Sequence, residues 1–265
     1  MTMQGKVAIV TGASRGIGEF IARRFAVDGA AVAVSARTVE EGDHKFPGSV
    51  ASTVRSIIDS GGTAIGVAAD LSKQEDRARL IETAEKELGP VDILVNNAAI
   101  TYFEPVDGFS ESHYRLMFEV QVRAPFELAQ LVVPGMKERK SGWILNISSG
   151  AARHPVGPPY VRGAGRGGTV YGMCKAALER FTTGLAAELY EDGIAVNVLS
   201  PSGLVATPGV VHHGLNKGVP DEMLEPPEMM AEASWALCTG DPSQLTGKVT
   251  YAKPILDELG IEVRA

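Results

Sequence analysis

Short runs of apolar, β-branched residues alternate along the chain with longer segments in which apolar residues recur every three or four positions. Nearly continuous apolar runs predict buried strands, and the longer period predicts amphipathic helices. Seven strands are predicted, the last of them weaker: Val7–Val10, Ala31–Ser35, Ala64–Val67, Ile93–Asn96, Trp143–Ile147, Ile194–Leu199 and Lys248–Tyr251. Helices are predicted over residues 16–28, 50–60, 73–88, 111–136, 171–190 and 223–238.

Regular alternation of strands and helices is typical of repeated βαβ units. We therefore expect an α/β fold in which helices cover both faces of a doubly wound parallel sheet of about seven strands. A chain of 265 residues is expected to form a single domain over residues 1–265. Two polar or Gly/Pro-rich stretches, residues 40–48 and 151–169, have the composition of inserted surface loops.

The composition argues against several kinds of binding partner. With 45% hydrophobic and 22% charged residues, the chain has the balance of a soluble globular protein. Its net charge of −7 argues against nucleic acid or an anionic membrane surface as the main partner. The two cysteines, Cys174 and Cys238, provide neither a disulfide framework nor a metal-ligand cluster, so no metal is expected. The first strand begins almost at the N-terminus and no apolar run approaches the ~20 residues that span a bilayer, so we expect a cytoplasmic protein.

A glycine-rich loop follows the first strand and precedes an amphipathic helix. It reads Thr11-Gly-Ala-Ser-Arg-Gly-Ile-Gly18. Glycines allow a tight turn and close approach of a pyrophosphate to the helix N-terminus, whereas the alternative is an ordinary strand-to-helix turn. The sequence predicts dinucleotide contacts from these residues: Gly12, Ser14, Arg15, Gly16, Ile17 and Gly18.

The end of the second strand indicates which dinucleotide is bound. NAD sites usually have an acidic residue there, but this segment reads Ser35-Ala36-Arg37-Thr38. Arg37 and Arg15 are suited to hold a 2′-phosphate, so NADP(H) is favoured over NAD(H), with Arg37 and Thr38 as cofactor contacts. Glu40 and Glu41 follow closely and leave NAD(H) as the alternative.

Tyr171 and Lys175 are separated by four positions, which places both side chains on one face of a helix. A nearby ammonium favours the phenolate and is expected to lower the pKa of Tyr171 from its usual value near ~10 toward the range useful for general acid–base catalysis. Tyr–Lys pairs also occur by chance on exposed helices, so the catalytic interpretation depends on other motifs that converge on the tyrosine.

From about Lys6 to Tyr251 the chain resembles the short-chain dehydrogenase/reductase family, whose fold is Rossmann-like. The glycine loop is similar to the family's cofactor fingerprint, and Tyr171 with Lys175 is similar to its catalytic pair. Ser148-Ser149, at the end of the predicted fifth strand, resembles the family's substrate-orienting serine, and Ser149 is the better match. Further matches are Asp70-Leu71 at the adenine, Asn96-Asn97-Ala98-Ala99 after the fourth strand, with Ala99 in place of the usual glycine, and Asn197–Pro201 with Thr207 at the nicotinamide carboxamide.

This resemblance implies an NAD(P)-dependent oxidoreductase that interconverts a secondary alcohol and a ketone or aldehyde by hydride transfer. Tyr171 would exchange a proton with the substrate oxygen, and Ser149 would donate a hydrogen bond to it. Lys175 would lower the pKa of Tyr171 and bind the nicotinamide ribose. The implied cofactor contacts are Asp70, Leu71, Asn97, Ala98, Ala99, Tyr171, Lys175, Pro201, Leu204, Val205 and Thr207. Members are usually homodimers or homotetramers, so we expect a homotetramer or homodimer.

The chain departs from the family pattern at three places. Gln121 stands where the family has a fourth catalytic residue, an asparagine, and we hypothesise that Gln121→Asn keeps or raises turnover. The stretch 151–169 lengthens the usual serine-to-tyrosine spacing and carries Arg153, Arg162 and Arg166. It is either a solvated loop or a border of the substrate cleft that attracts an anionic substrate.

The third departure is the nicotinamide segment, where Ser202 replaces the usual glycine and one residue is added before Thr207. We expect a substrate lid over about residues 201–225. Because Gln121 is atypical, a catalytically weak NADP-binding redox sensor is kept as a function of a different class.

Overall fold

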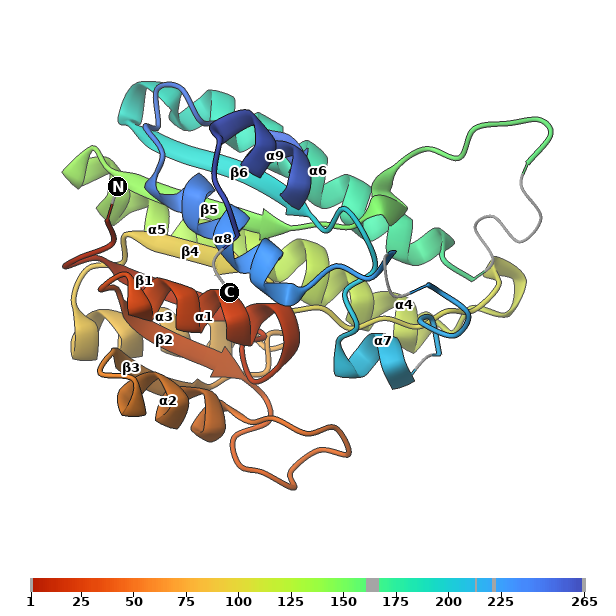
Figure 1. The fold of residues 1–265 in the computed structure, drawn as a ribbon, viewed down its shortest axis with the longest axis horizontal. Coiled ribbons are helices and arrows are strands. Elements are labelled where there is room, and N and C mark those ends of the chain that lie inside the picture. Colours follow the sequence, from red (N-terminus) through yellow and green to blue (C-terminus); the bar gives the residue numbers. More distant parts are fainter. Residues whose placement is uncertain (1, 161–166, 213, 221–222, 264–265) are drawn as a thin grey trace.

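The computed structural model describes residues 2–160, 167–212, 214–220 and 223–263, and its described strands form one parallel sheet (Figure 1). The strand order is β3-β2-β1-β4-β5-β6-β7. The strands are β1 Val7–Thr11, β2 Ala31–Ala36, β3 Thr63–Ala68, β4 Ile93–Asn96, β5 Gly142–Ile147, β6 Ile194–Ser200 and β7 Val249–Tyr251. The predicted fold class is confirmed, including the weak seventh strand.

Helices cover both faces of this sheet, as Figure 1 shows. Alternate side chains of β1 point to opposite faces: Ala8 and Val10 pack with α1, α2, α8 and α9, while Val7 and Ile9 pack with α3, α5 and α6. The helices are α1 Gly16–Val27, α2 Val50–Asp59, α3 Gln74–Leu88, α4 Glu111–Phe118, α5 Ala124–Arg139, α6 Thr169–Leu189, α7 Pro208–His212, α8 Pro227–Thr239 and α9 Ala252–Leu259.

The strand order reverses at β1. The chain first moves outward from β1 to β2 and β3, and then crosses back to β4 on the other side of β1. The loops after β1 and β4 therefore diverge at the carboxyl edge of the sheet and leave a crevice between them. This crevice is the place where the sequence-predicted residues are expected to meet.

Two predicted helices differ in the structure. The segment 111–136 is divided into α4, a π-helical turn over Glu119–Arg123 (η2) and α5. The helix predicted to start at residue 223 begins at Pro227, because Leu224 instead forms a parallel bridge with Leu204. The short helix α7 and the C-terminal helix α9 were not predicted.

Candidate active site

A cleft of about 710 Å³ lies along the carboxyl edge of the sheet and collects nearly all predicted site residues. Its lining comes from the loop after β1, the ends of β2 to β5, helix α6 and the segment after β6. The predicted residues in this lining are Gly12, Ser14, Arg15, Gly16, Ile17, Arg37, Thr38, Asp70, Leu71, Asn97, Ala98, Ala99, Ser149, Tyr171, Lys175, Pro201, Leu204, Val205 and Thr207. Gly18 and Gln121 are not part of the lining.

The glycine loop packs closely against the loop after β4 and leads into the uncapped N-terminus of α1. Gly12 has φ +65°, and a Cβ on it would come within 2.7 Å of the Ala98 Cα atom. Gly18 is buried, and a Cβ there would collide with the Gly12 carbonyl oxygen at 2.6 Å, so this glycine serves packing. No side chain caps the N-terminus of α1, which leaves its first N–H groups available for an anion.

Two basic side chains and one imidazole surround the cleft near the end of β2. Arg37 is exposed, lines the cleft and has no hydrogen-bond or ion-pair partner among the described residues. Arg15 donates to the Gly48 carbonyl oxygen and lies 3.3 Å from Nδ1 of His44, so it also holds the loop 40–48 against the glycine loop. Burial and the neighbouring Arg15, Lys45, Arg37 and His212 lower the pKa of His44.

Two acidic side chains of the loop 40–48, those of Glu41 and Asp43, accept hydrogen bonds from backbone N–H groups in or next to the loop. The Asp43 carboxylate accepts from the N–H groups of Val39 and Glu40, at 3.2 and 2.9 Å, and Glu41 accepts from the Gly48 N–H at 3.2 Å. None of these acids lines the cleft. The region where a ribose 2′-substituent would lie is therefore basic.

Polar side chains at the ends of β4 and β5 fix the centre of the cleft. Asn97 Nδ2 donates to the carbonyl oxygens of Thr11 and Gly12, at 2.9 and 3.1 Å, which ties the β4 end to the glycine loop. Both serines line the cleft, but Ser148 is buried and donates to Glu179 at 2.7 Å, whereas the Ser149 hydroxyl hydrogen-bonds with the Tyr171 phenol. The preference for Ser149 over Ser148 as the candidate catalytic serine therefore agrees with their hydrogen-bond partners.

Tyr171 lies in the first turns of α6, beside Ser149. The Ser149 hydroxyl hydrogen-bonds with the phenol and lowers its pKa, but burial outweighs this contact and raises the pKa of Tyr171 above its usual value. The direction is opposite to the one predicted from Lys175. Phe103 meets the Tyr171 ring edge-on, with centroids 6.1 Å apart, and lines the same part of the cleft. In this state the phenol is protonated at neutral pH.

Lys175 is buried, and its Nζ donates to the Ile147 carbonyl oxygen at 2.8 Å. The nitrogen lies 5.7 Å from the centroid of the Tyr171 ring, so the predicted one-face arrangement of the pair is present. Burial lowers the pKa of Lys175 to about 8. An ammonium so placed favours negative charge at the phenol only through space.

Gln121 lies behind the cleft, in the π-helical turn η2. Its Nε2 donates to the Ile100 carbonyl oxygen at 2.8 Å, and its Oε1 is buried without a hydrogen-bond partner among the described residues. Ile100 lies in the loop after β4 and lines the cleft. Gln121 thus supports the cleft wall from outside and does not itself face the cleft.

Glu225 is a site residue that the sequence did not indicate. Its Oε2 accepts from the backbone N–H groups of Ser202 and Gly203, at 2.6 and 2.8 Å, and its burial raises the pKa of the carboxyl group. Backbone bonds from Leu204 to Met223 and from Glu225 to Leu204 complete this pairing. Residues 201–204, which belong to the segment expected to hold the nicotinamide, therefore pair with residues 223–225 to form a strap. No local sequence motif indicates this pairing.

Two predicted loop arginines lie outside the described residues, within which there is neither a candidate metal cluster nor a helix able to span a membrane. Arg162 and Arg166 fall in the segment 161–166, which the structure does not describe. Within the described residues no cluster of His, Cys, Asp and Glu could hold a metal ion. No described helix has the length and apolarity of a membrane span.

Comparisons with known proteins identify the family and agree with the fold. A family model described as short chain dehydrogenase matches residues 6–214. Dehydrogenase/reductase SDR family member 4 of Sus scrofa is 35% identical over 258 residues, which covers 93% of this chain and 85% of the relative. A solved short chain dehydrogenase of Mycobacterium thermoresistibile has a TM-score of 0.84 at 30% identity, covering 98% of this chain and 89% of that one. A solved 3-oxoacyl (acyl-carrier-protein) reductase of Agrobacterium tumefaciens with NADP bound has a TM-score of 0.80 at 30% identity, covering 94% and 93%.

Proposed function

Because the chain belongs to the short-chain dehydrogenase/reductase family, we propose that it is an NADP(H)-dependent oxidoreductase that interconverts a secondary alcohol and a ketone or aldehyde, with Tyr171 as general acid and base. The convergence of Ser149, Tyr171 and Lys175 at the end of one cleft is the observation that carries the proposal. The chain would act as one catalytic domain with a lid over residues 201–225 and an inserted loop over 151–169.

In reduction, the protonated Tyr171 hydroxyl gives its proton to the substrate oxygen while Ser149 donates a hydrogen bond to the same atom. Both groups stabilise the charge that develops on that oxygen in the transition state. The bound nicotinamide supplies the hydride. Lys175 stabilises the resulting phenolate, because its ammonium lies 5.7 Å from the Tyr171 ring centroid. Phe103 shields this end of the cleft beside the phenol.

Turnover of a panel of ketones with NADPH tests the proposal. Wild type should oxidise NADPH in the presence of a ketone, and Tyr171→Phe should lower kcat by about 10²-fold or more, because general acid catalysis is removed. Binding of NADPH, measured by fluorescence, should persist in the variant. Undiminished turnover by Tyr171→Phe would refute the assignment. Absence of turnover in wild type, with NADPH binding intact, would favour the redox-sensor function.

The preference for NADP(H) rests on the basic environment at the end of β2. Arg37, Arg15 and His44 line this part of the cleft, and Glu41 and Asp43 are occupied by backbone N–H groups of their own loop. A 2′-phosphate would accept charge-assisted hydrogen bonds from Arg37, which has no partner among the described residues. Part of Arg15 remains engaged with Gly48.

Cofactor binding to Arg37→Asp tests this preference. We expect the Kd for NADPH to rise about 10- to 100-fold, in line with the loss of a charge-assisted contact, and the Kd for NADH to change little. Lys86→Asp makes the same charge change on α3 at a side chain that is 81% exposed, and serves as the control. Tighter binding of NADH than of NADPH by wild type would overturn the preference.

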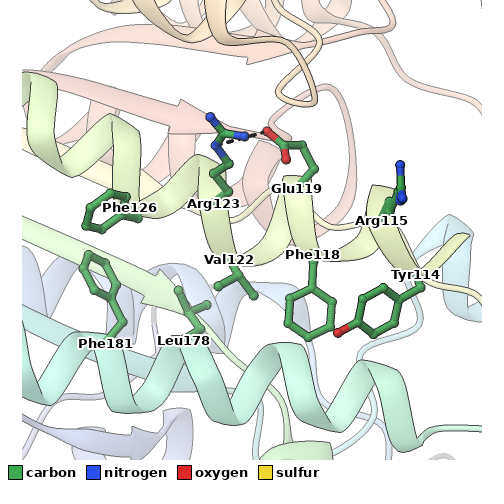
Figure 2. A pocket seen from close by; sticks show the side chains of 9 residues that line it. All are labelled: Tyr114, Arg115, Phe118, Glu119, Val122, Arg123, Phe126, Leu178 and Phe181. Carbon is green, nitrogen blue, oxygen red and sulfur yellow. Dashed lines mark ion pairs between the residues drawn. The ribbon is translucent and has the colours of Figure 1, made fainter. Parts of the chain in front are cut away.

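A homodimer or homotetramer is proposed through the helices that flank the active site. Figure 2 shows an apolar groove between α4–α5 and α6, with Tyr114, Phe118, Val122, Phe126, Leu178 and Phe181 in its wall. Phe126 is 46% exposed, which is a large fraction for an aromatic side chain. A second copy of the chain is the proposed occupant. Light scattering should find a multimer for wild type and a smaller species for Phe126→Asp, whereas a monomeric wild type contradicts the assembly.

A further inference from the structure

Arg153 lines the cleft and takes no part in the steps above. It follows the 3₁₀ turn Gly150–Ala152, which begins at Ser149, and its backbone N–H donates to the Gly150 carbonyl oxygen at 3.2 Å. The side chain is exposed and lines the same cleft as Ser149 and Tyr171. The chain thus holds a permanent positive charge close to the candidate serine.

An aromatic ring supports the guanidinium of Arg153. The guanidinium carbon lies 4.1 Å from the centroid of the Tyr251 ring. Tyr251 is the last residue of β7 and pairs with Ser200 at the end of β6, so its position is set by the sheet. A guanidinium that lies over a ring keeps the N–H groups at its rim available for an acceptor. The contact orients the group without neutralising it.

No carboxylate neutralises this charge among the described residues. The Arg153 side chain has no hydrogen bond and no ion pair there. Glu225, the acid of the strap, points its Oε2 at the N–H groups of Ser202 and Gly203. Asp70 is the one acidic side chain in the described lining, and it follows β3, at the opposite edge of the sheet from β7. An arginine without a carboxylate partner in the wall of a cleft is suited to bind an anionic group.

We propose that Arg153, held over Tyr251, binds an anionic group of the substrate, so that the preferred substrates are carbonyl compounds or alcohols that also carry a carboxylate or a phosphate. The inference rests on the proposed reaction at Ser149 and Tyr171. A carboxylate or phosphate can accept two parallel N–H bonds from a guanidinium, which orients the molecule as well as binding it. The carbonyl group is then presented to the Tyr171 hydroxyl.

The test compares acids with neutral analogues of the same carbon skeleton. The carboxylate probes are acetoacetate and levulinate, each against its methyl ester, and the phosphate probe is hydroxyacetone phosphate against hydroxyacetone. Arg153→Gln should lower kcat/KM for at least one anion class about 10- to 100-fold, mostly through KM, and change the neutral analogue less than about twofold. The two anion classes distinguish a carboxylate site from a phosphate site.

Binding provides a readout that does not depend on turnover. Calorimetry should show that the same anion binds the enzyme–NADP complex, and that Arg153→Gln weakens this binding while Arg153→Lys weakens it less. Tyr251→Leu should weaken it as well, because the platform of the guanidinium is lost. Arg180→Gln, an exposed arginine further along α6, is the control and should leave the binding unchanged.

Two results separate this inference from the proposed function. If wild type reduces neutral ketones through Tyr171 but Arg153→Gln changes kcat/KM for acids and neutral analogues by the same factor, the anion site is refuted. The proposed function then stands. If no ketone is reduced but an anion binds in an Arg153-dependent way, the function is refuted and the site stands. Failure of both anion classes to bind or react contradicts the proposed site.

Discussion

Tyr171 and Lys175 illustrate how burial and spacing compete at a single pair of residues. The spacing of four correctly predicted one helical face, and the ammonium lies 5.7 Å from the phenol ring. Burial nevertheless raises the pKa of Tyr171 and lowers that of Lys175 to about 8. Sequence spacing predicts neighbours, whereas the direction of a pKa shift depends on how much solvent the fold removes.

The lowered pKa of Lys175 predicts a pH dependence of stability. Between about pH 8 and 10.5 the unfolded chain binds this proton and the folded chain does not, so the free energy of unfolding should rise with pH through this window. The contribution is on the order of 3 kcal/mol at most, from the size of the shift. Chemical denaturation at pH 7.5 and pH 9.5 measures it.

Lys175→Met provides the comparison for this measurement, because it lacks the titrating group and keeps a long side chain in the same cavity. Wild type should gain stability relative to the variant as the pH rises. A relative loss of stability over the same interval would contradict the lowered pKa of Lys175.

The sequence shows that Gln121 stands where the family has a catalytic asparagine, but it does not show what the Gln121 amide contacts. Its donated bond to the Ile100 carbonyl oxygen predicts that Gln121→Leu destabilises the protein by about 1–3 kcal/mol, since that oxygen loses its donor. Gln121→Asn keeps an amide donor, so it should lose less stability than Gln121→Leu and should keep its turnover. Denaturation and steady-state kinetics of both variants measure this. Equal stability of wild type and Gln121→Leu would contradict the structural role.

At the scale of elements, the strands could be predicted well because their apolar runs are nearly continuous. The helix over 111–136 was only partly right, because the π-helical turn η2 around Gln121 has no signature in the apolar period. The strap between residues 201–204 and 223–225 could not be predicted either. It depends on a backbone pairing between segments whose sequences contain no regular pattern.

The strap predicts that Glu225 acts on cofactor binding from outside the cleft. Glu225→Ala leaves the N–H groups of Ser202 and Gly203 without their acceptor, so the neighbouring nicotinamide segment should lose its fixed geometry. We expect the Kd for NADP to rise about tenfold. Glu225→Gln retains an oxygen acceptor and should show a smaller effect.

Glu228→Ala, three positions further along at the start of α8, controls for the loss of an acidic side chain. Calorimetric titration measures the Kd for NADP in all three variants. An unchanged Kd in Glu225→Ala would mean that the strap does not position the cofactor segment.

At the scale of the whole molecule, the parallel sheet brings the site together. Residues at or just after the ends of all seven described strands meet in one cleft because these strands run in the same direction and the order reverses at β1. The fold, and the cleft residues that belong to motifs at strand ends, could therefore be predicted from the sequence. The contact between Arg153 and Tyr251 could not, since it joins the end of β5 to the end of β7 across β6.

Transfer of deuterium tests the central claim most directly. A ketone that the wild type reduces is incubated with NADPH deuterated at nicotinamide C4, and mass spectrometry with NMR locates the label in the product alcohol. The account predicts deuterium at the carbinol carbon for wild type and a rate at least about 10²-fold lower for Tyr171→Phe under single-turnover conditions. Label absent from that carbon, or equal transfer rates in the two proteins, would contradict hydride transfer assisted by Tyr171.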